Sequence, residues 1–186
     1  MISATLPVKK ETSKCLSIHH KRTCDCLPAT KINCLTAKEW LKSQLGVWQF
    51  NYSKKDVRDK NVHPATFPTS LAAKVIQLFS HKGELVLDPF VGSGTVLVAA
   101  QDAGRNAVGF DLKKEYVDLA TSRINENTAL FGDAQQIAVC EDAQNISEYL
   151  PHNSVSCIFT SPPYANLLNR KRTNKSRRDR KNEQLN

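Results

Sequence analysis

The sequence of 186 residues has no apolar run close to the ~20 residues that a membrane-spanning helix needs. Residues 1–26 also lack the apolar segment of about 7–15 residues that is typical of a secretory signal. These two absences predict a cytoplasmic protein that does not act at a membrane. In the cytoplasm, the six cysteines are expected to be thiols rather than disulfides.

The sequence also has little net charge outside its C-terminal end, because positive and negative residues nearly balance in the rest of the chain. Residues 169–186 carry eight Lys and Arg against two Asp and Glu, which accounts for most of the net charge of +8. This run is either an arm that contacts phosphates, with an affinity that falls as salt rises, or a solvated loop. We favour the loop, because runs of like charge are often disordered. The chain is therefore divided into an extension (1–35), one domain (36–168) and a basic tail (169–186).

The first 35 residues show neither helical nor strand periodicity, but they hold four of the six cysteines. Two histidines lie among them, so the stretch contains Cys15, His19, His20, Cys24, Cys26 and Cys34. Four thiols suggest zinc, yet the spacing C-x8-C-x-C-x7-C differs from the C-x2–4-C pairs that are usual in structural zinc sites. The alternative is a poorly ordered extension with free thiols, which we favour. The sequence alone therefore predicts no metal.

From Thr36 onward, helical and strand patterns alternate. Thr36 is a suitable N-cap for a short helix that ends near Gly46. A second helix begins at Thr69, and its expected buried face is Leu71, Val75, Ile76 and Phe79. Strands are predicted over 84–88, 106–111, 136–140 and 154–159, with helices over 96–104, 114–125 and 147–150 between them. This alternation is typical of an α/β fold with a doubly wound parallel sheet.

The first predicted strand runs directly into a glycine-rich turn. In open parallel sheets, ligands bind beyond the carboxyl ends of the strands. The turn, Asp88-Pro89-Phe90-Val91-Gly92-Ser93-Gly94-Thr95, lets the backbone approach a ligand closely. It has neither the G-x-G-x-x-G spacing of dinucleotide sites nor the Gly-Lys-Ser/Thr of a P-loop. NAD and nucleoside triphosphates are therefore disfavoured, and the alternative is an ordinary tight turn.

Two further predicted strands end in carboxylates. Asp111 can accept hydrogen bonds from both hydroxyls of a ribose, although Asp is also a common helix N-cap. Asp142 can accept a hydrogen bond from an adenine amino group. Because parallel strands end at the same edge of a sheet, Asp88, Asp111 and Asp142 together indicate a ligand site more strongly than any one of them.

Together, Asp88–Thr95 and Thr160–Tyr164 resemble the amino-methyltransferases of DNA that use S-adenosylmethionine. D-P-F-x-G-S-G-T is similar to their cofactor loop and T-S-P-P-Y to their catalytic loop, and His63–Phe79 is similar to the segment that closes over the methionine end. The resemblance covers roughly residues 36–168 and implies a Rossmann-like methyltransferase fold with S-adenosylmethionine as cofactor. The implied cofactor-binding residues are His63, Phe67, Asp88, Pro89, Phe90, Gly92, Ser93, Gly94, Thr95, Asp111 and Asp142.

The predicted catalytic residues of the second loop are Ser161, Pro162, Pro163 and Tyr164. The Ser161 hydroxyl and the Pro162 carbonyl suit acceptance of N–H groups from an exocyclic amine, and two prolines stiffen the loop. Tyr164 can stack on a base taken out of the duplex. Ser, rather than Asp or Asn, at the first loop position favours cytosine N4 over adenine N6. Methylation at cytosine C5 is disfavoured, because it needs a cysteine in a Pro-Cys loop and Cys157 lies within a strand.

Only four strands are predicted, whereas the sheet of this family has seven, so the C-terminal strands are expected to be missing. The expected function is site-specific transfer of a methyl group to cytosine N4 in duplex DNA. The chain would be a fragment or half of a split enzyme completed by a second polypeptide, its activity alone is left open, and a restriction endonuclease is a further candidate partner. The alternatives are an adenine-N6 enzyme, an RNA or protein amino-methyltransferase, and a non-catalytic module that binds S-adenosylmethionine or nucleic acid.

Overall fold

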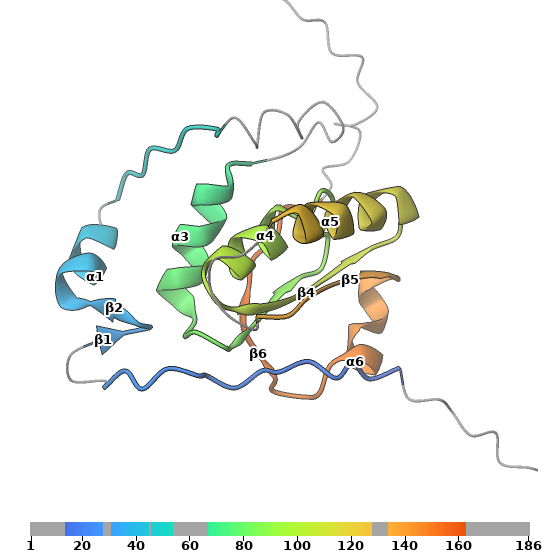
Figure 1. Cartoon of the computed structure of the whole chain (residues 1–186), viewed down its shortest axis with the longest axis horizontal. Helices are drawn as coiled ribbons and strands as arrows, with labels where there is room; N and C mark the ends of the chain where they lie inside the picture. Colours follow the sequence, from blue (N-terminus) through green and yellow to red (C-terminus); the bar gives the residue numbers. More distant parts are fainter. Residues whose placement is uncertain (1–13, 28–30, 45, 54–66, 128–133, 163–186) are drawn as a thin grey trace, which may run out of the picture.

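A four-stranded parallel sheet forms the centre of the protein (Figure 1). The computed structural model describes residues 14–27, 31–44, 46–53, 67–127 and 134–162. The strands are β3 (Leu85–Asp88), β4 (Asn106–Asp111), β5 (Gln136–Cys140) and β6 (Val155–Ile158), and they lie in the order β5-β4-β3-β6. Every neighbouring pair is parallel. The α/β alternation predicted from the sequence is therefore confirmed, with strand bounds that differ by one residue at most.

Helices cover one face of this sheet and a mixed layer covers the other. Helices α3 (Thr69–Phe79), α4 (Thr95–Asp102) and α5 (Lys114–Glu126) lie on the first face, and the second carries α6 (Ile146–Tyr149) and residues 14–27 (Figure 1). Alternate residues of each strand supply the two cores, because side chains of a strand point to opposite faces. In β3, Val86 is buried with the three helices, whereas Leu85 and Leu87 are buried on the second face.

Helix α3 differs from the sequence prediction in the side that it buries. Ala72 and Ile76 are buried against α4, as the 3–4 spacing requires. Phe79, expected on the buried face, is 58% exposed instead. It borders a groove between α3 and α1 (Ala37–Ser43), together with Trp48. The expectation for Phe79 was wrong because its side chain turns toward α1 rather than toward the sheet.

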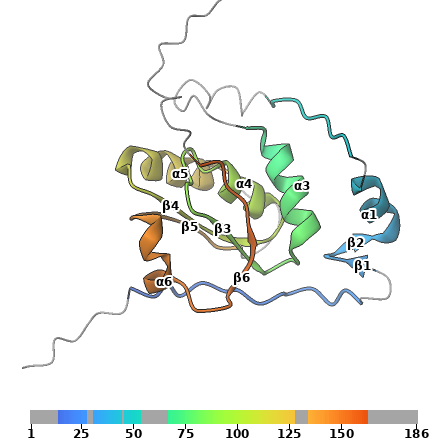
Figure 2. The same cartoon turned by 180° about the vertical axis from the view of Figure 1, so that it is seen from behind.

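Residues 14–27 run along the second face of the sheet rather than standing away from it (Figure 2). The backbone N–H of Leu16 donates to the Tyr149 carbonyl at 2.8 Å, and that of Thr23 donates to the Lys82 carbonyl at 2.8 Å. Ile18 is buried with the β4 side chains Val108 and Phe110. The sequence analysis expected little order here, because two alternating apolar residues, Leu16 and Ile18, are too few to produce a recognisable strand pattern.

A short hairpin leads from this segment to α1. Its strands β1 (Lys31–Ile32) and β2 (Leu35–Thr36) pair in antiparallel fashion. Thr36 then caps α1 as predicted: its hydroxyl accepts from the Glu39 N–H at 3.3 Å, and the Glu39 carboxylate accepts from the Thr36 N–H at 2.8 Å. In the parts of the chain that the structure describes, none of the helices combines the length and apolar character that crossing a bilayer requires.

Candidate functional site

The loop between β3 and α4 is packed so tightly that two of its contacts require glycine. Gly94 has φ +79°, and a Cβ there would lie 2.7 Å from the Cβ of Ala120 in α5. A Cβ on Gly109 in β4 would overlap with Cγ2 of Val91. The Val91 N–H donates to the Phe110 carbonyl at 2.8 Å. The loop is therefore held in one conformation against α5 and β4, with its backbone at the carboxyl edge of the sheet.

The two loop hydroxyls face inward and are bound by a buried arginine. Nη1 of Arg123 in α5 donates to the Ser93 carbonyl at 2.6 Å, to Ser93 Oγ at 3.1 Å and to Thr95 Oγ1 at 3.2 Å. All three residues are buried. These hydrogen bonds indicate that the Ser93 and Thr95 side chains stabilise the conformation of the loop. The cofactor-binding role expected for them stays a prediction. Arg123 was missed by the sequence analysis, because an arginine on an amphipathic helix normally faces solvent.

Asp88 begins the loop as a buried carboxyl group. It is 2% exposed, and its Oδ1 accepts the Phe90 N–H at 3.1 Å. Burial raises the pKa of Asp88 to about 6, and the Asp111 carboxylate adds to this, while the Thr160 hydroxyl and the Phe90 N–H oppose it. A carboxyl group that titrates near neutrality at a strand end is typical of a functional site.

Asp111 links the end of β4 to the glycine-rich loop. Its Oδ2 accepts the Gly92 N–H at 3.0 Å and its Oδ1 accepts the Lys113 N–H at 3.0 Å. The N-cap residue of α5 is Lys113, so Asp111 is not the N-cap that the sequence analysis considered as its alternative role. The half-buried carboxylate instead fixes the loop, and each of its oxygens can accept a further hydrogen bond.

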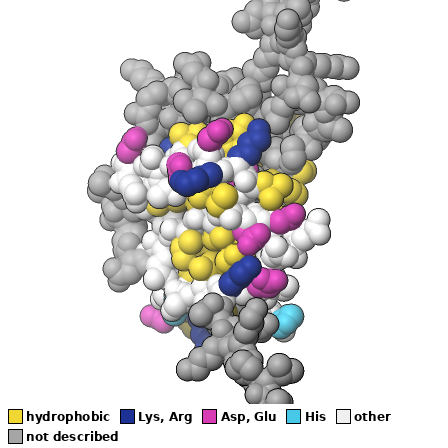
Figure 3. Space-filling view, turned by 90° about the vertical axis from the view of Figure 1, so that its right-hand side faces the viewer, with side chains coloured by type: hydrophobic (Ala, Val, Ile, Leu, Met, Phe, Trp, Pro, Cys, Tyr) yellow, Lys and Arg dark blue, Asp and Glu magenta, His cyan; other side chains and the backbone are white. Residues whose placement is uncertain are grey.

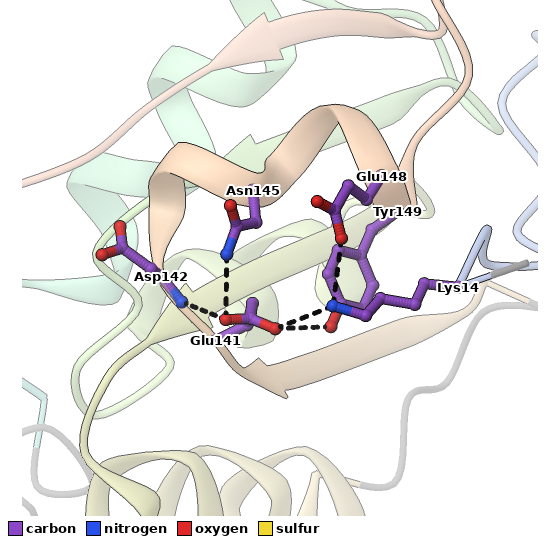
Figure 4. Close-up of polar contacts among 6 residues, drawn as sticks. All are labelled: Lys14, Glu141, Asp142, Asn145, Glu148 and Tyr149. Carbon is purple, nitrogen blue, oxygen red and sulfur yellow. Dashed lines mark hydrogen bonds and ion pairs between the residues drawn. The ribbon is translucent and has the colours of Figure 1, made fainter. Parts of the chain in front are cut away.

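The end of β5 carries two acidic residues with different surroundings (Figure 4). Asp142 caps the 3-10 helix η1 (Ala143–Asn145) by accepting the Gln144 N–H at 2.9 Å, and its carboxylate points away from the neighbouring cluster. Glu141 belongs to that cluster: it accepts from the Tyr149 hydroxyl at 2.8 Å and pairs with Lys14 at 3.5 Å. Hydrogen bonds from the Asp142 N–H and then from Tyr149 lower the pKa of Glu141 to about 2. Glu141 therefore attaches residues 14–27 to α6.

The predicted catalytic loop leaves β6 directly beside the cofactor loop. Strands β3 and β6 are adjacent, and the Phe159 N–H extends their pairing by donating to the Leu87 carbonyl at 3.1 Å. Ser161 and Pro162 follow and are exposed. The ring of Phe67, which comes just before α3, meets that of Phe159 edge-on at 5.5 Å between centroids. Three expected site residues, His63, Pro163 and Tyr164, lie outside the described residues.

Apolar side chains lie exposed beside these carboxylates. Phe90 is 42% exposed and Leu112, which follows Asp111, is 71% exposed. On the side of the molecule where α5, α6 and the end of β5 lie, hydrophobic side chains form patches bordered by acidic and basic ones (Figure 3). S-adenosylmethionine carries a ribose diol, an aromatic base and cationic groups. Hydrogen-bond-accepting carboxylates next to apolar surface match that combination, so the residues at this edge fit the cofactor.

The parallel α/β sheet is the fold of the Rossmann-like methyltransferases, the class that uses S-adenosylmethionine. A family model described as DNA methylase matches residues 5–122, and a model described as D12 class N6 adenine-specific DNA methyltransferase matches residues 69–185. Each match covers more than half of the chain. The chain therefore belongs to the family of DNA methylases that modify exocyclic amino groups, the N6 and N4 methyltransferases, whose methyl donor is S-adenosylmethionine.

Curated relatives are Type II methyltransferases. The chain is 36% identical over 95 residues to M.ScaI of Streptomyces caespitosus, covering 48% of this chain and 31% of the relative. It is 47% identical over 66 residues to M.MthZI of Methanothermobacter thermautotrophicus, covering 36% and 19%. A solved structure from Thermus thermophilus, named as a candidate DNA modification methylase, has 28% identity and a TM-score of 0.44, covering 61% of this chain and 45% of that one. The chain thus spans between about a fifth and a third of the curated relatives that it matches.

Proposed function

We propose that the carboxyl edge of the sheet binds S-adenosylmethionine and presents it to a base of duplex DNA for methylation of an exocyclic amine. The observation that carries this proposal is the adjacency of β3 and β6, which end in the glycine-rich loop and in Thr160-Ser161-Pro162. A donor site and an acceptor site must lie within reach of each other for direct transfer. Two loops on neighbouring parallel strands satisfy this requirement.

The cofactor would be held by residues from three strand ends. Asp111 would accept hydrogen bonds from the ribose hydroxyls, and Asp142 would accept one from the adenine amine. Phe90 and Leu112 supply apolar surface on which the adenine can lie. Asp88, once ionised, attracts the positive end of the ligand. The bound cofactor supplies an electrophilic methyl group on a sulfonium centre.

The acceptor amine would be bound by the loop after β6. The Ser161 hydroxyl and the Pro162 carbonyl would accept its N–H groups and hold the nitrogen in a nucleophilic geometry, and the proton that the methylated nitrogen loses would pass to solvent. Because the loop follows directly on β6, the hydrogen bonds between β6 and β3 hold its first residues in place. The target amine is inaccessible inside a base stack, so the base must leave the duplex. No covalent bond between protein and base is needed.

The base that we propose is cytosine, with N4 as the methylated atom, because serine opens the second loop. A second candidate is adenine N6. It is supported by the match of residues 69–185 to the D12 class, which is described as adenine-specific. DNA is the proposed substrate in both cases. Because the relatives are several times longer than the matched segment, a second polypeptide that supplies further strands is part of the proposal.

Methyl transfer from labelled S-adenosylmethionine tests the proposal. Duplex DNA, tRNA and protein are offered together, and the DNA is digested to nucleosides for mass spectrometry. N4-methylcytosine is the expected product, whereas N6-methyladenine would select the second candidate. Label in tRNA or protein, with none in DNA, would contradict the proposed substrate.

A substitution in the second loop separates transfer from cofactor binding. Ser161→Ala is expected to abolish transfer and to leave the Kd for S-adenosylmethionine unchanged, because Ser161 is exposed and lies outside the cofactor loop. Ser156→Ala in β6 is the matched control, since Ser156 is also exposed. Equal loss of cofactor binding and transfer in Ser161→Ala would show that the serine is structural instead.

A further inference from the structure

Three thiols and one imidazole converge at the end of the sheet opposite to the proposed cofactor site. The ligand atoms of Cys24, Cys26, Cys34 and His81 all lie within 4.8 Å of one another. His81 precedes β3 and so lies at the amino ends of the strands, whereas Asp88 lies at the carboxyl ends. The cluster is half-buried. No part of the proposed methyl transfer uses it.

Of five distances between these ligand atoms, four lie within about 0.3 Å of those in a tetrahedral zinc site, and the Cys24–Cys26 distance is about 0.6 Å shorter. With Zn–S bonds of about 2.3 Å and a Zn–N bond of about 2.0–2.1 Å, the edges of a regular tetrahedron are about 3.8 Å between sulfurs and about 3.5 Å from sulfur to nitrogen. Here Cys26 Sγ lies 3.8 Å from Cys34 Sγ and 3.2 Å from Cys24 Sγ. His81 Nδ1 lies 3.4 Å, 3.2 Å and 3.6 Å from the sulfurs of Cys24, Cys26 and Cys34.

The same distances do not describe disulfides. A disulfide requires sulfurs about 2.05 Å apart, and all these cysteines are free thiols in the structure. The spacing of Cys24 and Cys26, with one residue between them, differs from usual zinc motifs. Sequence spacing is a weaker criterion here because Cys34 and His81 come from other segments of the chain. The four ligand atoms are nevertheless close enough together to bind one ion.

Contacts outside the cluster hold the four ligands in place. The Thr23 N–H donates to the Lys82 carbonyl at 2.8 Å, which sets Cys24 beside His81. A Cβ on Gly83 would lie 2.5 Å from Cγ2 of Thr23, so the two segments pack closely. The His81 N–H in turn donates to the Glu84 carboxylate at 2.7 Å.

The third thiol is positioned by a turn in an uncommon conformation. Asn33 and Cys34 join β1 to β2 with φ values of 49° and 69°, as in the type I′ turns that usually carry glycine. The Asn33 amide donates to the Leu78 carbonyl, and the Asn33 carbonyl accepts from the buried Arg105 guanidinium at 3.5 Å. Arg105 also donates to the Ser80 carbonyl at 2.7 Å. The surrounding structure therefore fixes Cys34 at some cost in backbone strain.

We propose that Cys24, Cys26, Cys34 and His81 bind one structural zinc ion. Four protein ligands close the coordination sphere, as in structural rather than catalytic zinc sites. The cysteines bind as thiolates and release their protons to solvent, and His81 binds through its neutral Nδ1. The ion joins residues 14–27 and the β1–β2 hairpin to the end of α3, which keeps Leu16 and Ile18 on the second face of the sheet. Compared with the four-cysteine set of the sequence analysis, His81 replaces Cys15.

Metal content tests this proposal directly. The full chain is purified without a polyhistidine tag, and its zinc is measured by mass spectrometry. One zinc per chain is expected for the wild type and for the controls Cys15→Ser and Cys140→Ser, which change thiols outside the cluster. Cys26→Ser and His81→Gln are expected to lose it and to unfold at lower temperature. No zinc in the wild type, or equal zinc in Cys26→Ser and Cys15→Ser, would overturn the assignment.

Cobalt keeps the proposal testable even where a ligand variant does not fold. Co²⁺ substituted into the wild-type chain is expected to give the intense visible absorption of a tetrahedral site and a near-ultraviolet charge-transfer band from three thiolates. Three thiols should also react with a thiol reagent only after a chelator is added. Weak octahedral absorption, or free reaction of all thiols without a chelator, would contradict the proposal and would indicate a cluster that exists only as thiols or as oxidisable pairs.

Discussion

The sites at the two ends of β3 differ in how many segments of the chain form them. At the carboxyl end, a continuous stretch from Asp88 to Thr95 supplies most of the site, and Arg123 and Asp111 hold it from neighbouring elements. At the amino end, three separate segments each contribute part of the Cys24, Cys26, Cys34 and His81 cluster. A continuous site can be recognised in a sequence, because its spacing is visible. A site assembled from distant segments becomes visible only in the fold.

The largest expected effect is a loss of stability when a glycine at the carboxyl end of the sheet is replaced by alanine. Gly94→Ala at the carboxyl end adds a Cβ 2.7 Å from that of Ala120 at φ +79°. A left-handed alanine costs about 1–2 kcal/mol and overpacking about 1–3 kcal/mol, so a loss of about 2–5 kcal/mol in the free energy of unfolding is expected. Urea denaturation measures it. Affinity for S-adenosylmethionine should fall with it, because α4 and the loop must move.

Gly104→Ala at the amino end is the matched control. Gly104 also has a positive φ, +70°, but a Cβ there meets only the Lys82 side chain, at 3.9 Å. The expected cost is therefore the left-handed conformation alone, about 1–2 kcal/mol. Equal losses for the two variants would show that the contact between the loop and α5 is not what makes Gly94 necessary.

The next largest effect is a dependence of stability on pH that arises from Asp88. Its pKa is raised from 3.8 to about 6 in the folded protein, so the folded state holds a proton that the unfolded state has lost. The contribution of Asp88 to stability therefore falls as the pH rises from about 4 to about 6, by roughly 3 kcal/mol, and then stays level. Asp88→Asn, which cannot ionise, should lack this fall. Chemical denaturation at several pH values measures it.

The affinity for S-adenosylmethionine is expected to depend on the ionisation of Asp88 in the opposite direction, rising with pH where the stability falls. If ionised Asp88 attracts the positive end of S-adenosylmethionine, then affinity should increase as the pH rises through about 6 in the wild type and not in Asp88→Asn. A wild-type profile of stability that is flat between pH 4 and pH 6 would mean that Asp88 is ionised throughout and that its burial is compensated by other groups.

Particular residues show how far the sequence could predict this molecule. The alternation of strands and helices, the Thr36 cap and the placement of Asp88, Asp111 and Asp142 at one edge followed from local patterns and from the rule that parallel strands end at one edge. The second face of the sheet could not be predicted, because Leu16 and Ile18 are buried by the fold of the whole chain. Arg123 and His81 were missed for the same reason: each acts on residues that are distant in the sequence. The prediction for Phe79 was wrong because helical spacing indicates which residues share a face of the helix but not which element packs against that face.

Equilibrium binding of labelled S-adenosylmethionine tests the central assignment, the cofactor site at the carboxyl edge, most directly. One saturable site is expected in the wild type, with an affinity at least tenfold lower in Asp111→Ala, because a hydrogen bond to a charged group contributes about 1.5–3 kcal/mol. Glu148→Ala, which removes an equal charge from the exposed surface of α6, should bind like the wild type. No saturable binding, or equal loss in the two variants, would contradict the account.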